Sequence, residues 1–201
     1  MTKKRVRERT VKLSCDPIKT EFTVLGLDCS SSTIGWGLVG CRPDKTLALL
    51  AHGHIKPLTS KCDFMERLSN VFDRITALCE EFKPTLVAVE DILIYVRGSS
   101  SARTITILAA FNRVAALAAF RCTGKLHLYD VHDIRRILKV ACGLGRTPEK
   151  EQMPNLVRAH LEPQFSDILK LRGGGMADTT CDEADGIAVA WACALDIRSK
   201  A

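Results

Sequence analysis

Several features that would place the protein in a well-marked class are missing from its sequence. No apolar run approaches the ~18 residues that a membrane-spanning helix needs, and the first residues form no apolar signal region. The nine cysteines are odd in number, scattered mostly through apolar runs, and form no CxxC or CxxH pair. We therefore expect free thiols, no membrane association, and a reducing, cytoplasmic location.

Internal repeats and glycine-rich phosphate-binding loops are missing as well, whereas positive charge is abundant at one end. The formal charge is +6 over 201 residues, and six of the first twelve residues are Lys or Arg. We interpret residues 1–20 as a flexible basic tail that suits a polyanion such as nucleic acid. A solvated tail or an import sequence is the alternative. Residues 21–201 are expected to form one domain.

The spacing of apolar residues predicts an α/β domain. Short links between the first three strands require antiparallel pairing, whereas the nearly continuous apolar run at 85–90 is typical of a buried parallel strand. We expect strands at 22–28, 34–41, 47–55, 85–90 and 125–130, and helices at 63–82, 102–121, 131–141, 149–161 and 182–198. This order predicts a mixed five-stranded sheet, three antiparallel strands and then parallel ones, flanked by helices.

Acidic residues stand at the ends of buried elements. Asp28 ends the first strand and Glu90 ends the strand at 85–90. Because burying a lone carboxylate costs several kcal/mol, a cationic partner is expected beside each; for Asp28 the alternative is that it caps the following turn. Asp182 and Asp185 share one face of the last helix, where the alternative is stabilisation of the helix N-terminus in its first turn.

Convergence of these acids would create a site for metal ions. If the strands at 22–28 and 85–90 are neighbours, Asp28 and Glu90 meet at one edge of the sheet, and the last helix can bring in Asp185. Gathered carboxylates repel one another and raise each other's pKa. Divalent cations remove that repulsion, and an all-oxygen ligand set suits Mg²⁺ or Mn²⁺. Two such ions would support hydrolysis of a phosphodiester.

Three blocks of sequence carry a family resemblance. They lie at 24–28 with Ser31 and 35–37, at 87–90, and at 182–190. In order and spacing they resemble the signature blocks of the RuvC family, Holliday junction resolvases of the ribonuclease H-like superfamily, and the resemblance spans roughly residues 22–198.

The resemblance implies a ribonuclease H-like fold and a homodimer that binds four-way DNA junctions. Each subunit would nick one of two symmetrically placed strands, leaving 5′-phosphate and 3′-hydroxyl ends, with two Mg²⁺ or Mn²⁺ ions per site. The catalytic and metal-binding acids implied by the resemblance are Asp28, Glu90, Asp182 and Asp185.

Seven residues are candidates for contacts to nucleic acid. Arg135 and Lys150 match basic positions of the family, in regions 129–135 and 148–152. Arg136 and Lys139 are chosen for their charge and their position on the helix at 131–141. Arg97 and Arg103 follow Glu90 closely, and a solvated loop is the alternative there. Tyr95 is the nearest ring to the aromatic that the family inserts at the junction core. In chain order the seven are Tyr95, Arg97, Arg103, Arg135, Arg136, Lys139 and Lys150.

Some positions depart from the family pattern. Cys29 and Ser30 stand where the family usually has Pro-Gly, and Asp91 adds a fifth acid. Leu93 aligns near the inserted aromatic, so the junction contact differs or passes to Tyr95. The glycines at 173–175 have no counterpart in the family.

Histidines and tryptophans provide further candidates. His52 and His54 share one face of a strand and could bind metal, but we interpret them as exposed residues of an edge strand. His132, at a strand end near Arg135, could assist catalysis or hold a phosphate. Trp36 and Trp191 are expected in the core rather than as base-stacking groups.

These patterns favour a metal-dependent, structure-selective DNA endonuclease. One alternative is another ribonuclease H-like nuclease that acts on flaps, RNA or hybrids. A second is the sugar-kinase and actin superfamily, which expects phosphate loops that this sequence lacks. A third is a non-catalytic junction-binding protein, which would not need all four acids.

Overall fold

One mixed β-sheet forms the centre of the computed structural model, which describes residues 9–12, 19–92, 101–161 and 178–200. Within these residues six strands follow the order β1-β4-β3-β2-β5-β6. Pairing is antiparallel from β1 to β2 and parallel from β2 to β6. The strands are β1 (Arg9–Lys12), β2 (Phe22–Cys29), β3 (Ile34–Cys41), β4 (Leu47–Ile55), β5 (Leu86–Glu90) and β6 (Leu126–Tyr129). The predicted mixed sheet is confirmed, with one strand more than expected.

The additional strand, β1, lies in the segment that we predicted to be a flexible tail. Its residues pair with β4, so that Arg9 lies opposite His54 and Lys12 lies opposite Ala51. A short strand with basic residues is a common way to end a sheet, because Lys on an edge discourages further pairing. The pairing also means that β4 is not an edge strand.

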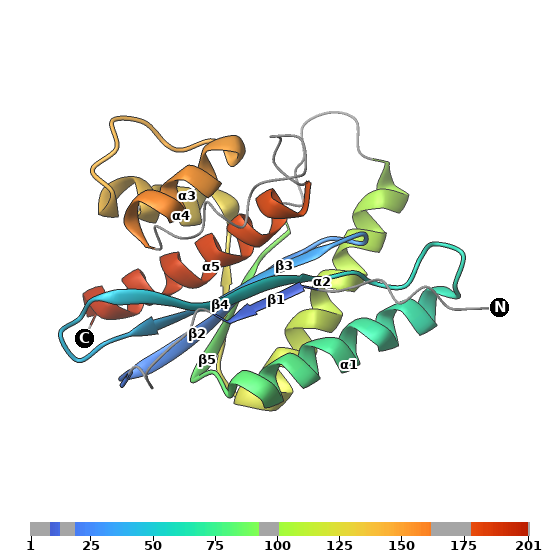
Figure 1. The fold of residues 1–201 in the computed structure, drawn as a ribbon. Helices are drawn as coiled ribbons and strands as arrows, with labels where there is room; N and C mark the ends of the chain where they lie inside the picture. Colours follow the sequence, from blue (N-terminus) through green and yellow to red (C-terminus); the bar gives the residue numbers. More distant parts are fainter. Residues whose placement is uncertain (1–8, 13–18, 93–100, 162–177, 201) are drawn as a thin grey trace.

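Helices cover both faces of the sheet (Figure 1). On one face lie α1 (Phe64–Phe82) and α2 (Ala102–Thr123); on the other lie α3 (Val131–Ala141), α4 (Met153–His160) and α5 (Asp178–Lys200), with the 3-10 turn η1 (Lys150–Gln152) before α4. The side chains of Asp63, Ser101 and Asp130 accept backbone N–H groups at the starts of α1, α2 and α3. Such caps stabilise a helix start by ~1 kcal/mol.

The start of α5 differs from the prediction in a way that bears on the acids. We expected the helix at 182–198, with Asp182 in its first turn, but it begins at Asp178. Asp182 and Asp185 therefore lie beyond the first turn, where a carboxylate no longer stabilises the free N–H groups and the helix dipole. Stabilisation of the helix N-terminus does not account for these two acids.

Two apolar layers hold the helices to the sheet. α5 contributes the largest share of the first layer, including Trp191, together with residues of the strands, α3 and α4. The second layer joins α1 and α2 to the opposite face and contains Trp36. The centroids of the Trp36 and Phe82 rings are 5.4 Å apart. Both tryptophans are buried, as predicted.

By length and composition alone, α2 is the one helix in the described ranges that could cross a membrane. Its inner side, with Phe111 and Ala115, is buried in the second apolar layer, as in the core helix of a folded domain. On the outer side Leu117 and Phe120 remain 53% and 51% exposed.

Glycines allow α5 to lie directly on the β2–β3 hairpin. A Cβ atom on Gly35 would overlap the carbonyl oxygen of Asp182, and one on Gly186 would lie 2.5 Å from the backbone of Gly35. A Cβ atom on Gly26 would likewise overlap the backbone of α5. Side chains at these positions would push the helix away. The turn that carries Asp182 is thereby held against the hairpin.

Candidate active site

The pairing of β2 with β5 brings two acids to the same edge of the sheet. The strands are parallel neighbours with Leu27 opposite Val89, so the next residues, Asp28 and Glu90, lie side by side. On the α2 side, the buried Asn112 donates a hydrogen bond of 2.7 Å from Nδ2 to the carbonyl oxygen of Glu90. The predicted meeting of the two strand ends is confirmed.

A small pocket joins these two acids to α5. Its volume is about 80 Å³, well above the ~10–15 Å³ that one water molecule requires. The lining comes from β2, β5, α3, η1, α4 and α5, and consists of Asp28, Glu90, Val131, Ile134, Arg135, Lys150, Met153, Asp185 and Ala188. Asp182 is not among the described lining residues, although its charge raises the pKa of Asp28.

Burial and mutual repulsion raise the pKa of each acid in the pocket. The pKa of Asp28 rises from its ordinary 3.8 to about 7, through burial and then the charge of Asp185. The pKa of Glu90 rises from 4.5 to about 8, through burial and then the charges of Asp28 and Asp185. Burial also raises the pKa of Asp185, although Lys150 lowers it in part. The pocket therefore disfavours its own negative charges.

Two basic side chains partly balance these acids. Lys150 Nζ lies 2.9 Å from Asp185 Oδ2. Burial lowers the pKa of Lys150, but Asp185, through its charge and hydrogen bond, and then Asp28 outweigh burial and raise that pKa above its usual range. The charge of Arg135 lowers the pKa of Glu90. Both residues that the family resemblance assigned to phosphate contacts thus line the acidic pocket.

The carboxylates of the pocket are the right kind of ligand for a hard divalent cation, but they are not yet arranged around one ion. In the part of the chain that the structure describes, no three His, Cys, Asp or Glu side chains already form a group that could hold one ion. Asp28, Glu90 and Asp185 nevertheless line one pocket and carry raised pKa values. Carboxylate oxygens are the ligands that Mg²⁺ and Mn²⁺ prefer, and a divalent charge would relieve their repulsion.

The turn after β2 is held by Ser30. Its Oγ accepts hydrogen bonds from the backbone N–H groups of Ser32, at 3.2 Å, and Thr33, at 2.9 Å, and donates one to the Thr33 carbonyl. The turn therefore has a side-chain cap that is independent of Asp28, whose carboxylate lines the pocket instead.

The fifth acid, Asp91, has a structural partner. Arg113 Nη2 lies 2.7 Å from Asp91 Oδ1, and the same oxygen accepts the backbone N–H of Ile92. Asp91 also lines a second hollow, of about 200 Å³, which shares Asp28 and Glu90 with the acidic pocket. The acid pair thus lines two hollows.

The other predicted contacts to nucleic acid lie away from the acidic pocket or outside the described residues. Arg136 is exposed and pairs with Asp133 at 2.9 Å, while Lys139 is partly buried on α3. Arg103 is exposed in the first turn of α2, and His132 is exposed in the first turn of α3. None of these four is among the described lining residues of the pocket. The predictions for Leu93, Tyr95, Arg97 and the glycines at 173–175 lie outside the described residues.

The prediction for His52 and His54 was wrong. Both are buried, at 0% and 8% exposure, because β1 covers β4 from the side and α5 lies over its face. Their Nδ1 atoms lie 2.7 Å and 2.8 Å from the two carboxylate oxygens of Glu183. Burial raises the pKa of Glu183, but hydrogen bonds from the two histidines outweigh burial and hold that pKa below its usual range. No role was predicted for Glu183 from the sequence.

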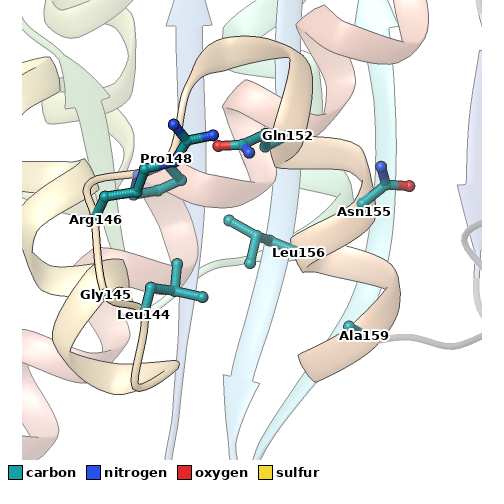
Figure 2. A pocket seen from close by; sticks show the side chains of 8 residues that line it. All are labelled: Leu144, Gly145, Arg146, Pro148, Gln152, Asn155, Leu156 and Ala159. Carbon is teal, nitrogen blue, oxygen red and sulfur yellow. The ribbon is translucent and has the colours of Figure 1, made fainter.

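A larger pocket, of about 410 Å³, lies between the loop after α3 and α4 (Figure 2). Arg146 is the charged residue among the eight that line it, and the acids of the candidate site are not among those eight. This pocket is therefore separate from the carboxylates. Its lining consists of Leu144, Gly145, Arg146, Pro148, Gln152, Asn155, Leu156 and Ala159.

The eight cysteines in the described ranges are free thiols, as expected. Cys29 lies beside the acids, and burial, followed by the charges of Asp28 and Glu90, raises the pKa of its thiol. The thiol is therefore neutral and weakly reactive at ordinary pH.

Comparisons with known proteins identify relatives of the chain. The family described as "Crossover junction endodeoxyribonuclease RuvC" matches residues 24–192, a range that includes all four predicted acids. A protein of that name from Caulobacter vibrioides is 30% identical over 167 residues, covering 83% of this chain and 86% of the relative. Another, from Rubrobacter xylanophilus, is 28% identical over 183 residues, covering 91% and 90%.

Solved structures of resolvases share the fold. Thermus thermophilus RuvC in complex with a Holliday junction substrate has a TM-score of 0.65 at 20% identity, covering 88% of this chain and 96% of that one. The yeast mitochondrial Holliday junction resolvase Ydc2 has a TM-score of 0.59 at 16% identity, covering 92% and 85%. The sheet order, the pocket of acids and the family match lead to one conclusion: the chain belongs to the RuvC family of metal-dependent crossover junction endodeoxyribonucleases.

Proposed function

We propose that this chain resolves four-way DNA junctions by paired, symmetric nicks. The observation that carries the proposal is the pocket in which Asp28, Glu90 and Asp185 meet Arg135 and Lys150, in a chain of this family. Acids that repel one another suit metal ions, and basic side chains beside them suit a phosphodiester.

The acids of the pocket are the proposed ligands of two Mg²⁺ or Mn²⁺ ions. Asp182, which is not among the described lining residues, is proposed as a further ligand. Bound there, two divalent ions would activate a water molecule and stabilise the leaving oxygen of an in-line displacement. Departure of the 3′ oxygen leaves a 3′-hydroxyl and a 5′-phosphate. Asp28 and Glu90 end neighbouring strands of the sheet, so ions bound between them would have a fixed position relative to the phosphate.

Lys150 has a proposed role that follows from its ion pair. Its ammonium group pairs with Asp185 in the pocket, at 2.9 Å. If Asp185 served as a metal ligand, Lys150 would lose part of this attraction, and its charge would be available to an oxygen of the phosphate. Arg135, which faces the same pocket, offers a fork of N–H donors to that group.

A homodimer is the proposed assembly, and the outer side of α2 is the proposed interface. Leu117 and Phe120 on α2 are 53% and 51% exposed, and Leu128 on the adjacent edge strand β6 is 45% exposed. Large apolar side chains exposed together are typical of an interface between subunits. Two copies joined this way would supply one nuclease site for each of two strands, in a reducing compartment that contains DNA.

The experiment is cleavage of a synthetic four-way junction by the parent, Asp28→Asn and Glu90→Gln. Duplex, flap and RNA–DNA hybrid substrates accompany the junction, with Mg²⁺, Mn²⁺ or chelator. We expect metal-dependent cleavage of the junction by the parent, and loss of cleavage with retained junction binding in both variants. Glu80→Gln, which removes an exposed acid of α1, is the matched control.

Two results would count against the proposal. Undiminished nicking by either pure variant would show that the replaced acid is not needed for the reaction. Faster cleavage of flaps or hybrids than of the junction would favour another ribonuclease H-like nuclease.

A further inference from the structure

The side chain of Glu183 links the acid-bearing turn of α5 to strand β4, two strands away from β2 in the sheet. It is 2% exposed, and each of its carboxylate oxygens lies within 2.8 Å of an Nδ1 atom, that of His52 or of His54. A buried carboxylate can only accept hydrogen bonds, so each imidazole donates Nδ1–H to one oxygen. We refer to these three residues as the His–Glu–His clamp.

The clamp passes over a strand whose glycines leave room for it. In the pairing of β3 with β4, Gly35 lies opposite His54 and Gly37 lies opposite His52, so all four residues are on one face of the sheet. α5 rests on these glycines, because a Cβ on Gly35 would overlap the Asp182 carbonyl and one on Gly37 would lie 2.6 Å from the Ile187 Cα. Glu183 can therefore reach across β3 to the histidines of β4.

The position of Glu183 in the helix gives the clamp its effect on the acids. Glu183 stands between Asp182 and Asp185, and successive residues of an α-helix project about 100° apart. Holding Glu183 against β4 fixes the rotation of this turn about the helix axis. That rotation sets where Asp185 enters the pocket opposite Asp28 and Glu90.

Apolar packing alone fixes this rotation less well. Apolar contacts, such as those of the buried Ala184, Ile187 and Ala188, have no preferred direction, so a slight turn of the helix changes their energy little. The energy of two charge-assisted hydrogen bonds with defined directions changes strongly.

We propose that Glu183 is a positioning residue, which through His52 and His54 holds the acid-bearing turn of α5 in the orientation that completes the metal site. This inference rests on the proposed function, because it assigns Asp185 to a metal site. Glu183 itself does not touch the reacting atoms.

The test measures metal binding apart from cleavage. The melting temperature of the full chain is recorded against Mg²⁺ concentration, since an ion that binds the folded state raises that temperature. In Glu183→Ala we expect the half-saturating Mg²⁺ concentration to rise by about 10-fold or more, as is usual when a residue that supports metal ligands is removed. Binding of a four-way junction in chelator should stay within about twofold of the parent.

A conservative variant and a matched control separate positioning from general stability. In Glu183→Gln, one histidine can donate to the amide oxygen and the other can accept from the amide nitrogen after a change of tautomer. We therefore expect Gln to restore a half-saturating Mg²⁺ concentration within about threefold of the parent. Tyr129→Phe removes another hydrogen bond to α5, the part-buried 2.9 Å bond to Asp196, and should lower stability without changing Mg²⁺ affinity.

An unchanged half-saturating Mg²⁺ concentration in Glu183→Ala, or an equal rise in Tyr129→Phe, would overturn the proposal. If Glu183→Ala does not fold, His54→Ala decides by the same criterion, because it removes one donor at the more exposed end of the clamp. A parent that binds Mg²⁺ but cuts no junction would refute the proposed function, while the titration would still judge the clamp.

Discussion

Replacing Glu90 with glutamine should stabilise the protein at alkaline pH in the presence of chelator. Burial, Asp28 and Asp185 raise the pKa of Glu90 from 4.5 to about 8 in the folded chain, whereas an unfolded chain restores the ordinary value. Between these values the folded state binds more protons, so the free energy of unfolding falls as the pH rises from about 4.5 to about 8. Glutamine has nearly the same shape and carries no such charge.

The size of the effect follows from the two pKa values. Each unit of difference between the folded and unfolded pKa values corresponds to ~1.4 kcal/mol, so the free energy of unfolding could fall by about 5 kcal/mol over this pH range. Because the side chain is partly exposed and its charge is shared with Asp28, we expect less than half of this, about 2 kcal/mol. For a chain of this size that corresponds to a rise in melting temperature of roughly 4–8 °C.

The assay is thermal unfolding in chelator at pH values from 5 to 9, for the parent, Glu90→Gln and the control Glu80→Gln. The advantage of Glu90→Gln should be small at pH 5 and greatest above pH 8, and the control should follow the parent. Saturating Mg²⁺ should stabilise the parent more than the variant and reduce or reverse the difference. A variant that melts below the parent at pH 8.5 in chelator would refute this account of the pocket.

Three further predictions concern packing, assembly and charge. Gly35→Ala should lower the free energy of unfolding by about 1–3 kcal/mol, because its Cβ would overlap the Asp182 carbonyl; denaturant unfolding checks this, with Gly145→Ala, in open space, as control. Leu117→Glu should convert the proposed dimer to a monomer in light scattering, whereas Val140→Glu, on α3 and 76% exposed, should not. Lys150→Met should move the acidic limb of the pH–rate profile to higher pH, because Lys150 lowers the pKa values of Asp28, Glu90 and Asp185.

Local patterns predicted most of the fold. Alternating or continuous apolar runs define strands, and apolar residues at helical spacing define helices, so these elements agree within a few residues. These features depend on residues that are close in the sequence. The meeting of Asp28 with Glu90 was expected on the condition that their two strands are neighbours, and the parallel pairing of β2 with β5 meets that condition.

The errors arose where distant segments decide the structure. β1 is too short to carry a pattern of its own and becomes a strand by pairing with β4. His52 and His54 looked exposed because nothing near them in the sequence indicates that a carboxylate some 130 residues later will pair with them. Glu183 was overlooked because Asp182 and Asp185 on either side matched the family pattern. Buried polar pairs of this kind have no local signature.

The acidic pocket combines groups that repel one another, so other parts of the fold must keep them together. The raised pKa values of Asp28 and Glu90 reflect a force that would move α5 away from β2 and β5. Three contacts oppose it: the direct packing of α5 on Gly35, the hold of Glu183 on β4, and the ion pair of Lys150 with Asp185. The first two contacts are independent of charge in the pocket. They would therefore preserve the shape of the pocket if Asp185 bound a metal ion and Lys150 turned to a phosphate. A site held by Lys150 alone would open when that lysine changed partner.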